Sequence, residues 1–283
     1  MRMSPKLTQQ VAFSLCWLAA LIGIAALVII VGYVIIKGAG ALSWDFVTTD
    51  RTGGITQDTG GIRSSIIGTL WIVGLTLGFA CPLGIGAGIY MAEYARDNWI
   101  TAVIRWVIET LAGIPSILFG MFGFALFVMA LSLGFSIIAG ALTLACLVLP
   151  TVIRTTEEAI KAVPHSYREA AYALGATKWQ TIRHVVLYGA MPGIITAIIL
   201  ALGRAVEETA CLYVTMGGSA MHIPESPTDS GATLSLDLLA RAIDMNDMEA
   251  AFGAGIILVG TIIVINSLTR LIANRWMARM QGS

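Results

Sequence analysis

The chain has 283 residues with 17 basic and 17 acidic side chains, so its formal net charge is zero. Hydrophobic residues make up 57% of it and charged residues only 12%, whereas soluble domains carry roughly 25% charged residues. This composition excludes a soluble globular domain. Most of the chain is therefore expected to lie in a lipid bilayer, and no nucleic-acid partner is expected.

The residues that chemistry would need are not grouped. No lysine is followed by Ser or Thr, as an ATP-binding P-loop would require. The four cysteines form no C-x-x-C pair, and the three histidines are scattered and form no H-E-x-x-H motif. These residues are Cys16, Cys81, Cys146, Cys211, His165, His184 and His222. We interpret the cysteines as small buried hydrophobes and expect no metal, cofactor or catalytic residue in this chain.

An apolar run over 11–36 follows Arg2 and Lys6 near the N-terminus. The apolar part of a cleaved signal peptide is roughly 7–15 residues long, whereas this run is long enough to cross a bilayer. We expect a short cytoplasmic N-terminus over 1–10 and a retained first membrane helix.

Six segments reach the roughly 20 apolar residues that span a bilayer core about 30 Å thick. They are 11–36, 65–92, 102–130, 132–152, 191–215 and 250–273. The third and fourth are nearly continuous, so the hairpin at 130–135 is the least defined boundary and five spans are the alternative. The sequence predicts an all-α fold, a polytopic membrane helix bundle of about six transmembrane helices over 11–273, followed by a cytoplasmic C-terminus over 274–283.

The segments between the spans indicate the orientation. Residues 37–64 and 216–249 are too polar to span and are expected to form outer loops, and 234–243 is amphipathic enough for a short interfacial or re-entrant helix. With the N-terminus inside, 12 of the 17 basic residues fall on the cytoplasmic side, as the positive-inside rule requires. Both termini are therefore predicted to be cytoplasmic.

The loop between the fourth and fifth spans is polar but helical in character. Pro164 suits a helix start, and Ser166 with Glu169 three residues later is a capping-box pattern. Gly175 is the expected C-terminal stop, and a second helix is expected over 178–187. The sequence predicts a helix, a turn and a helix over 163–188.

This spacing resembles the EAA loop of ABC-importer permeases: Glu-Ala-Ala at 169–171, three residues, Gly175, nine residues, then a hydrophobic residue and Leu187. In that family the first short helix docks on the ATPase subunit and transmits its closing motion. The resemblance implies that the coupling residues are Arg168, Glu169, Ala170, Ala171, Leu174 and Gly175. Tyr188 stands where the family usually has Pro, which weakens the helix break predicted there, and Pro192, four residues later, is the alternative position for that break. A plain solvated hairpin is the alternative.

Further blocks resemble PstA-type permeases of phosphate ABC importers over about residues 58–215. They lie at 60–62, 68–70, 82–85, 89–94, 113–120 and 204–210. The resemblance implies a MetI-like type I importer permease in a bacterial inner membrane. Its implied partners are a PstC-type second permease, a PstB-type ATPase dimer that binds ATP and Mg²⁺, a PstS-type phosphate-binding protein, and phosphate itself.

Arg204 is the main candidate for the substrate path. It lies near the middle of the predicted fifth span, where a charge costs roughly 2.5–3.5 kcal/mol on insertion scales. A permanently charged guanidinium can bind two phosphate oxygens at once. The structural alternative is an intrahelical ion pair with Glu207 or Glu208, at i+3 and i+4.

Glu207 departs from the family, which usually has Gly there, and Cys211 stands where Pro is usual. One Arg facing two ionised carboxylates would repel an anion. We therefore expect one of Glu207 and Glu208 to be protonated, or an Arg of the partner permease to complete the cluster.

Other charged residues have two interpretations each. Arg154 is either an inner exit for the anion or an ordinary positive-inside anchor. Arg105 and Glu109 are spaced i,i+4 and are expected to pair. Glu93 is expected at a solvated cytoplasmic edge, with contact to the ATPase as the alternative.

Three rival functions remain. A permease for another oxyanion such as phosphonate would share these motifs. A stand-alone channel or secondary carrier has no need of the 163–188 loop. An intramembrane enzyme would need a nucleophile beside a base, and no such cluster is found.

Overall fold

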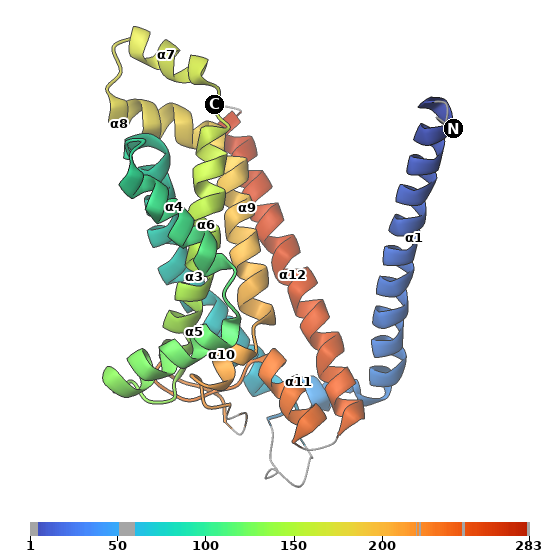
Figure 1. The fold of residues 1–283 in the computed structure, drawn as a ribbon. Helices are drawn as coiled ribbons and strands as arrows, with labels where there is room; N and C mark the ends of the chain where they lie inside the picture. The colour runs from blue at the N-terminus through green and yellow to red at the C-terminus, as the bar shows by residue number, and fades with distance from the viewer. Residues whose placement is uncertain (1–4, 51–59, 219, 221, 245–246, 282–283) are drawn as a thin grey trace.

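The structure is a computed structural model that describes residues 5–50, 60–218, 220, 222–244 and 247–281 (Figure 1). Parts of the predicted cytoplasmic ends (1–4 and 282–283) and of the first predicted outer loop (51–59) lie outside the described residues. The long helices are α1 (Pro5–Gly38), α3 (Arg63–Ile89), α4 (Trp99–Ala112), α6 (Ile137–Lys161), α9 (Leu187–Glu207) and α12 (Met248–Gln281). The shorter ones are η1 (Ala39–Ala41), α2 (Trp44–Thr48), η2 (Tyr90–Tyr94), α5 (Ser116–Gly123), η3 (Phe124–Ala130), α7 (His165–Ala173), α8 (Lys178–Thr181), η4 (Ile182–Val186), α10 (Ala210–Tyr213) and α11 (Leu234–Ile243).

The predicted all-α membrane bundle is confirmed. Among the described residues, five helical segments are long and apolar enough to cross a bilayer, and a sixth crossing is possible if the bent pair 99–112 and 116–130 counts as one span. Helices suit this setting because they satisfy every backbone hydrogen bond within one segment. The chain is thus a multi-pass membrane protein.

The third expected span, 102–130, is not one straight helix. It breaks after α4, and the axes of the two parts differ by 101°. Pro115 explains the break: it lacks an N–H, and it disfavours helical geometry in the residue before it. Gly113 ends α4, so α5 leaves in a new direction.

Two further helix boundaries differ from those expected. The fourth span begins at Ile137, where the Ser136 hydroxyl accepts a hydrogen bond from the Ala139 N–H, and it continues to Lys161 instead of ending at 152. The fifth span ends at Glu207 instead of 215, because Glu208 has extended backbone. Arg204 therefore lies in the last turn of α9 and not in the middle of a longer helix.

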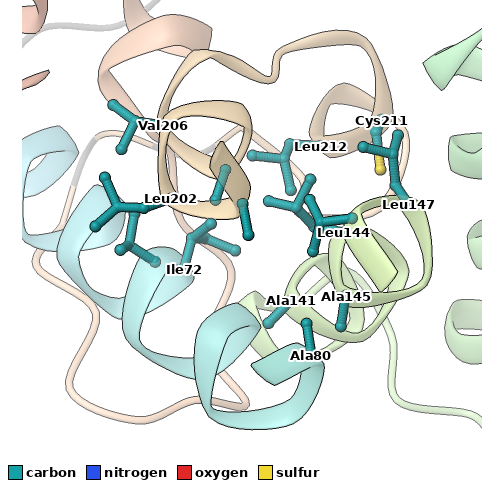
Figure 2. Packing of buried hydrophobic residues seen from close by; sticks show 14 of the residues in the cluster. Ile72, Ala80, Ala141, Leu144, Ala145, Leu147, Leu202, Val206, Cys211 and Leu212 are labelled. Atoms are coloured by element: carbon teal, nitrogen blue, oxygen red, sulfur yellow. The ribbon is translucent and has the colours of Figure 1, made fainter. Parts of the chain in front are cut away.

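The core lies where α6 packs between α3 and α9 (Figure 2). Side chains of Ile72 from α3, Leu144 from α6 and Leu202 from α9 meet there, and Leu212 of α10 covers one end. Lipid is as apolar as these side chains, so close packing holds the helices together more than the hydrophobic effect does.

Helix α1 stands apart from this core (Figure 1). It contacts α12 and η1, and most of its apolar side chains are exposed. Cys16, expected to be buried, is exposed on this helix. The first helix therefore offers its surface to lipid or to another chain.

The short helix expected over 234–243 is present as α11, and it joins the two outer loops. Arg241 Nε donates to Asp237 Oδ2 at 2.9 Å, and its Nη2 donates to the Gly61 carbonyl at 3.0 Å. The guanidinium also lies 5.2 Å from the centroid of the Phe46 ring. Both charged side chains are almost fully buried, and the bond from Arg241 to the Gly61 carbonyl fixes α11 against the segment that leads into α3.

The described elements divide between two ends of the bundle. In Figure 1, α7, the beginning of α1 and the end of α12 lie at one end, and α11 lies at the opposite end. This arrangement places the polar hairpin after α6 on the same side as the start of α1 and the end of α12.

Gly88 allows α3 and α6 to approach closely. A Cβ at this position would lie 2.7 Å from the Thr156 Cβ and 2.9 Å from the Ile153 carbonyl oxygen. We expect Gly88→Val to lower the free energy of unfolding by about 1–3 kcal/mol through overpacking. The measurement is thermal unfolding of the detergent-purified protein. Gly86→Val is the control, because nothing lies within 4 Å of a Cβ there; equal losses in both variants would contradict the expectation.

Candidate functional site

The hairpin between α6 and α9 has the form that the sequence predicts. Helix α7 ends before Gly175, whose φ of +80° is a left-handed conformation that glycine adopts without strain. The predicted capping box is wrong, because Pro164 precedes α7 and no side chain caps it. The capping box is instead at the second helix, between Thr177 and Gln180.

Helix α7 has two faces. Arg168 and Ala171 are buried, whereas Glu169, Ala170 and Gly175 are exposed. Leu174, 90% exposed, projects into solvent at the helix end. Between α7 and the α8–η4 segment lies a hollow of about 740 Å³ whose lining includes Ala170, Ala171, Leu174 and Gly175. The exposed side chains of Tyr167 and Leu174 both line this hollow and form a contiguous apolar patch with it, and such patches mark protein-interaction sites.

Arg168 fastens α7 to two other elements. Its Nη2 and Nε donate to Glu93 Oε1 at 2.7 and 3.0 Å, and both side chains are about nine-tenths buried. Its remaining bonds go to the carbonyl oxygens of Val163 (2.8 Å) and Ile160 (3.0 Å), at the C-terminal end of α6. A cation there satisfies free carbonyls and complements the helix dipole.

Glu93 lies on η2, the π-helical end of α3, and not at the solvated edge that the sequence suggested. The same turn is held from the other side: Lys178 Nζ donates to the Glu93 carbonyl and lies 4.6 Å from the Tyr94 ring centroid. The hairpin therefore contacts α3 through both of its helices. Arg168 and Glu93 are 75 positions apart, so no local sequence pattern could have paired them.

The return into the membrane is continuous. Helix α8, the π-helical turn η4 and α9 follow one another without a gap, and Pro192 lies inside α9. The alternative break position at Pro192 is wrong. Among the described residues, the irregular geometry falls earlier, over 182–186, where a π-turn adds one residue to the helical repeat.

The i,i+4 pair expected between Arg105 and Glu109 is also wrong. Both residues pair across to α6: Arg105 Nε donates to Glu157 Oε1 at 2.8 Å, and Glu109 Oε1 lies 2.8 Å from Arg154 Nη1. Glu158 also accepts from Arg154 Nε at 3.0 Å. These pairs line a small cavity of about 150 Å³ between α4 and α6.

Arg154 therefore lies in this ion-pair cluster. It does not line the cavity that contains Arg204. Its role as an inner exit stays a prediction. Two carboxylates already offset its charge at the end of the bundle nearer the hairpin.

Arg204 lines a different cavity, of about 430 Å³, within the bundle. The walls come from the α4–α5 break, α6, α9 and α12, and the lining includes Ile114, Thr151, Gly203, Arg204, Glu207 and Asn266. Thr151 lies midway along α6. The new end of α9 thus leaves Arg204 beside the middle of α6, and its depth in the bilayer stays a prediction.

The two carboxylates beside Arg204 differ in exposure. The Glu208 side chain is 6% exposed, its Oε2 lies 3.6 Å from Arg204 Nε, and its Oε1 accepts from the Cys211 N–H at 3.4 Å. Glu207 is 59% exposed, its Oε1 lies 3.8 Å from Arg204 Nη1, and it lines the cavity. Glu208 is therefore a structural partner of the helix end, and Glu207 faces the open space.

Both ion pairs are too long to be hydrogen bonds. Among the described residues, Arg204 donates no hydrogen bond, and its side chain is 48% exposed. A guanidinium with free donors in an apolar cavity can bind an anion transiently.

Thr151 and Asn266 share the cavity with Arg204 and were not predicted from the sequence. Asn266 lies in the sixth span, and its buried Oδ1 finds no hydrogen-bond partner in the described part of the chain. A polar residue inside an apolar span was the available signal, because such groups are costly there unless they serve a site.

A membrane bundle with a charged interior cavity and an exposed helical hairpin at one end is the architecture of a transport permease. The chain belongs to the family described as "Binding-protein-dependent transport system inner membrane component", which matches residues 84–278. It is therefore an inner membrane component of a transport system.

The relatives that this chain resembles include proteins named as permeases of ABC or phosphate transport systems. The chain is 37% identical to the "Probable ABC transporter permease protein YqgI" of Bacillus subtilis, over 98% of this chain and 97% of the relative. It is 34% identical to the "Phosphate transport system permease protein PstA 1" of Mycobacterium tuberculosis, covering 95% and 91%. The PstA protein of Yersinia pestis is 38% identical, covering 73% and 69%.

Solved structures share the fold. A bacterial alginate ABC transporter in complex with its pentasaccharide-bound periplasmic protein matches with a TM-score of 0.68 and 15% identity, covering 96% of this chain and 98% of that one. An inward-facing MetNI methionine transporter matches with a TM-score of 0.59 and 18% identity, covering 77% and 95%. These likenesses confirm the expected MetI-like type I permease fold.

We expect the buried Arg168–Glu93 pair to be needed for the stability of the folded chain. We expect Glu93→Gln or Arg168→Gln to lower the free energy of unfolding by about 3–5 kcal/mol, because each leaves a buried charge unpaired. Thermal unfolding in detergent measures the loss. The double variant should lose less than the sum of the two single losses.

Glu169→Gln is the matched control, since it removes a charge from the exposed face of the same helix. Single variants that melt at the same temperature as this control would show that the buried pair does not stabilise the hairpin.

Proposed function

We propose that this chain is the transmembrane permease subunit of an ATP-driven phosphate importer and forms half of its translocation path. The observation that carries the proposal is the free guanidinium of Arg204 in a cavity inside the bundle. The identity to PstA proteins over most of the chain supports phosphate as the anion.

Coupling to a separate ATPase would run through α7. Its exposed residues Glu169, Ala170, Leu174 and Gly175 offer a docking face, and its buried face holds Arg168 against η2. A push on the exposed face would reach α3 through this short, buried ion pair. No ATP site is proposed in this chain, and ATP with Mg²⁺ would be bound by the partner.

The partners follow from the same proposal: a PstC-type second permease, a PstB-type ATPase dimer and a PstS-type phosphate-binding protein. The binding protein would dock at the end that carries α11, within the outer loops 37–64 and 216–249. Both termini and α7 would then lie in the cytoplasm, with the chain in the bacterial inner membrane.

A moderate affinity suits this path. An anion must bind well enough to enter and weakly enough to leave, so one partly offset guanidinium is more suitable than several free ones. Glu208 supplies that offset from its buried position at 3.6 Å. ATP binding and release would alternate the access to Arg204 between the two sides of the membrane.

Replacing Arg204 tests the path. We expect Arg204→Gln to lower ATP-dependent phosphate uptake about tenfold or more in proteoliposomes that contain all partner subunits, because the cavity loses its cation. Arg270→Gln is the control: it removes a positive charge from α12, and Arg270 does not line the Arg204 cavity. Full uptake with Arg204→Gln would remove this residue from the path.

Replacing Leu174 tests the docking face. Leu174→Asp places a charge at a position that is 90% exposed, so the fold should be kept while an apolar contact with the ATPase is lost. We expect the ATPase to stop copurifying with the permease. Ile243→Asp, 69% exposed at the far end of the bundle, should leave copurification intact; equal recovery of ATPase with both variants would contradict docking at α7.

A further inference from the structure

The Arg204 cavity contains hydrogen-bond acceptors that an anion without an O–H could not use. The cavity has one cation, Arg204, yet its lining also includes the acid Glu207 and the amide residue Asn266. A site for an anion that only accepts hydrogen bonds would need donors, and a carboxylate would repel that anion. The extra acceptors therefore need an explanation.

Glu207 is free to serve a ligand. Its carboxylate lies 3.8 Å from Arg204, which is an ion-pair distance, and it accepts no hydrogen bond from the described residues. Glu208, by contrast, already accepts from the Cys211 N–H and is buried. Only Glu207 of the two presents its carboxylate oxygens to the cavity.

Asn266 is the second free group. Its Oδ1 is buried and lacks a partner among the described residues, which is costly in a low-dielectric interior. The amide can present either its acceptor oxygen or its donor nitrogen to a ligand. It reaches the same cavity from α12, whereas Glu207 and Arg204 come from α9.

Resting on the proposed function, we propose that this cavity selects a protonated tetrahedral oxyanion, with Arg204 binding its charged oxygens and Glu207 and Asn266 accepting from its O–H. Dihydrogen phosphate and hydrogen phosphate, both present near neutral pH, carry two and one O–H groups beside their charged oxygens, whereas sulfate carries no O–H. An acceptor that pairs with a ligand O–H favours the protonated ligand. Against an anion without an O–H, the same acceptor stays unpaired and repels the ligand. Glu207 and Asn266 are thus specificity residues of the path.

The role of Glu207 is tested by whether replacing it lowers or raises phosphate uptake. In proteoliposomes with all partner subunits, Glu207→Leu should lower kcat/KM of phosphate uptake about tenfold, because an acceptor is lost. Glu207→Gln keeps an acceptor oxygen and should retain more uptake than Glu207→Leu. If Glu207 only repels the anion, both variants would raise uptake, and the proposal would be overturned.

Asn266→Leu should also lower uptake. Thr269→Val is its matched control, since Thr269 lies one turn further along α12, bonds its own helix at the Ile265 carbonyl and does not line this cavity. Equal uptake in the two variants would remove Asn266 from the proposal.

Ligand discrimination is read from the thermal stability of the permease–ATPase complex without the binding protein, because a bound ligand stabilises the folded state. Phosphate should raise Tm more than sulfate at equal ionic strength, and Glu207→Leu with Asn266→Leu should abolish this difference. Any phosphate effect that persists in Arg204→Gln comes from another site and is subtracted. Equal shifts by the two anions in the wild type would overturn the proposal.

The two proposals can fail separately. If the wild type shows no ATP-dependent phosphate uptake, the proposed function fails. If the wild type transports phosphate and the Glu207 and Asn266 variants transport it equally well, only the selection of a protonated oxyanion fails.

Discussion

A permanent positive charge in the middle of a membrane bundle is the constraint on which the rest of this structure depends. Arg204 cannot lose its proton, so the surrounding chain must either neutralise it or give it access to water and ligand. Helix α9 ends three residues later, and the freed backbone carries Glu208 into the interior as a partner at 3.6 Å. The break between α4 and α5 opens space in front of the guanidinium, and the cavity forms there. The end of α9, the buried Glu208 and the break between α4 and α5 therefore together accommodate the charge of Arg204.

The same helices connect this cavity to the hairpin at the end of the bundle. Arg168 joins α7 to η2 at the end of α3, and α3 packs closely along α6 through Gly88. Helix α6 supplies Thr151 to the cavity wall and, further along, the carbonyls that Arg168 caps. A displacement of α7 would therefore act on both helices at once. The buried ion pair costs desolvation energy, so its value here lies in fixing the geometry of the hairpin.

Much of this could be predicted from the sequence, and the failures have identifiable causes. Hydropathy over about 20 residues indicates where helices cross, so the number of spans and the hairpin over 163–188 were accessible. Hydropathy does not report where an apolar helix stops, so the ends of α6 and α9 were misplaced; Pro115 was the visible signal for the broken span. Charge spacing suggested that Arg105 would pair with Glu109 on its own helix, but packing of α4 on α6 offered Glu157 instead. Contacts between distant segments, such as Arg168 with Glu93 or Asn266 beside Arg204, leave no local pattern.

Thiol labelling can test whether the Arg204 cavity is a water-accessible anion path with alternating access. In a variant whose four native cysteines are replaced, Gly203→Cys would place a thiol in this cavity, and a Cβ there meets nothing within 4 Å. We expect a negatively charged, membrane-impermeant reagent to reach this thiol from one side of the membrane without nucleotide and from the other side when ATP is trapped. Phosphate should slow the reaction. Gly78→Cys, which also has open space but does not line the cavity, should stay unlabelled. A Gly203→Cys thiol that reacts from neither side in any nucleotide state would contradict the account.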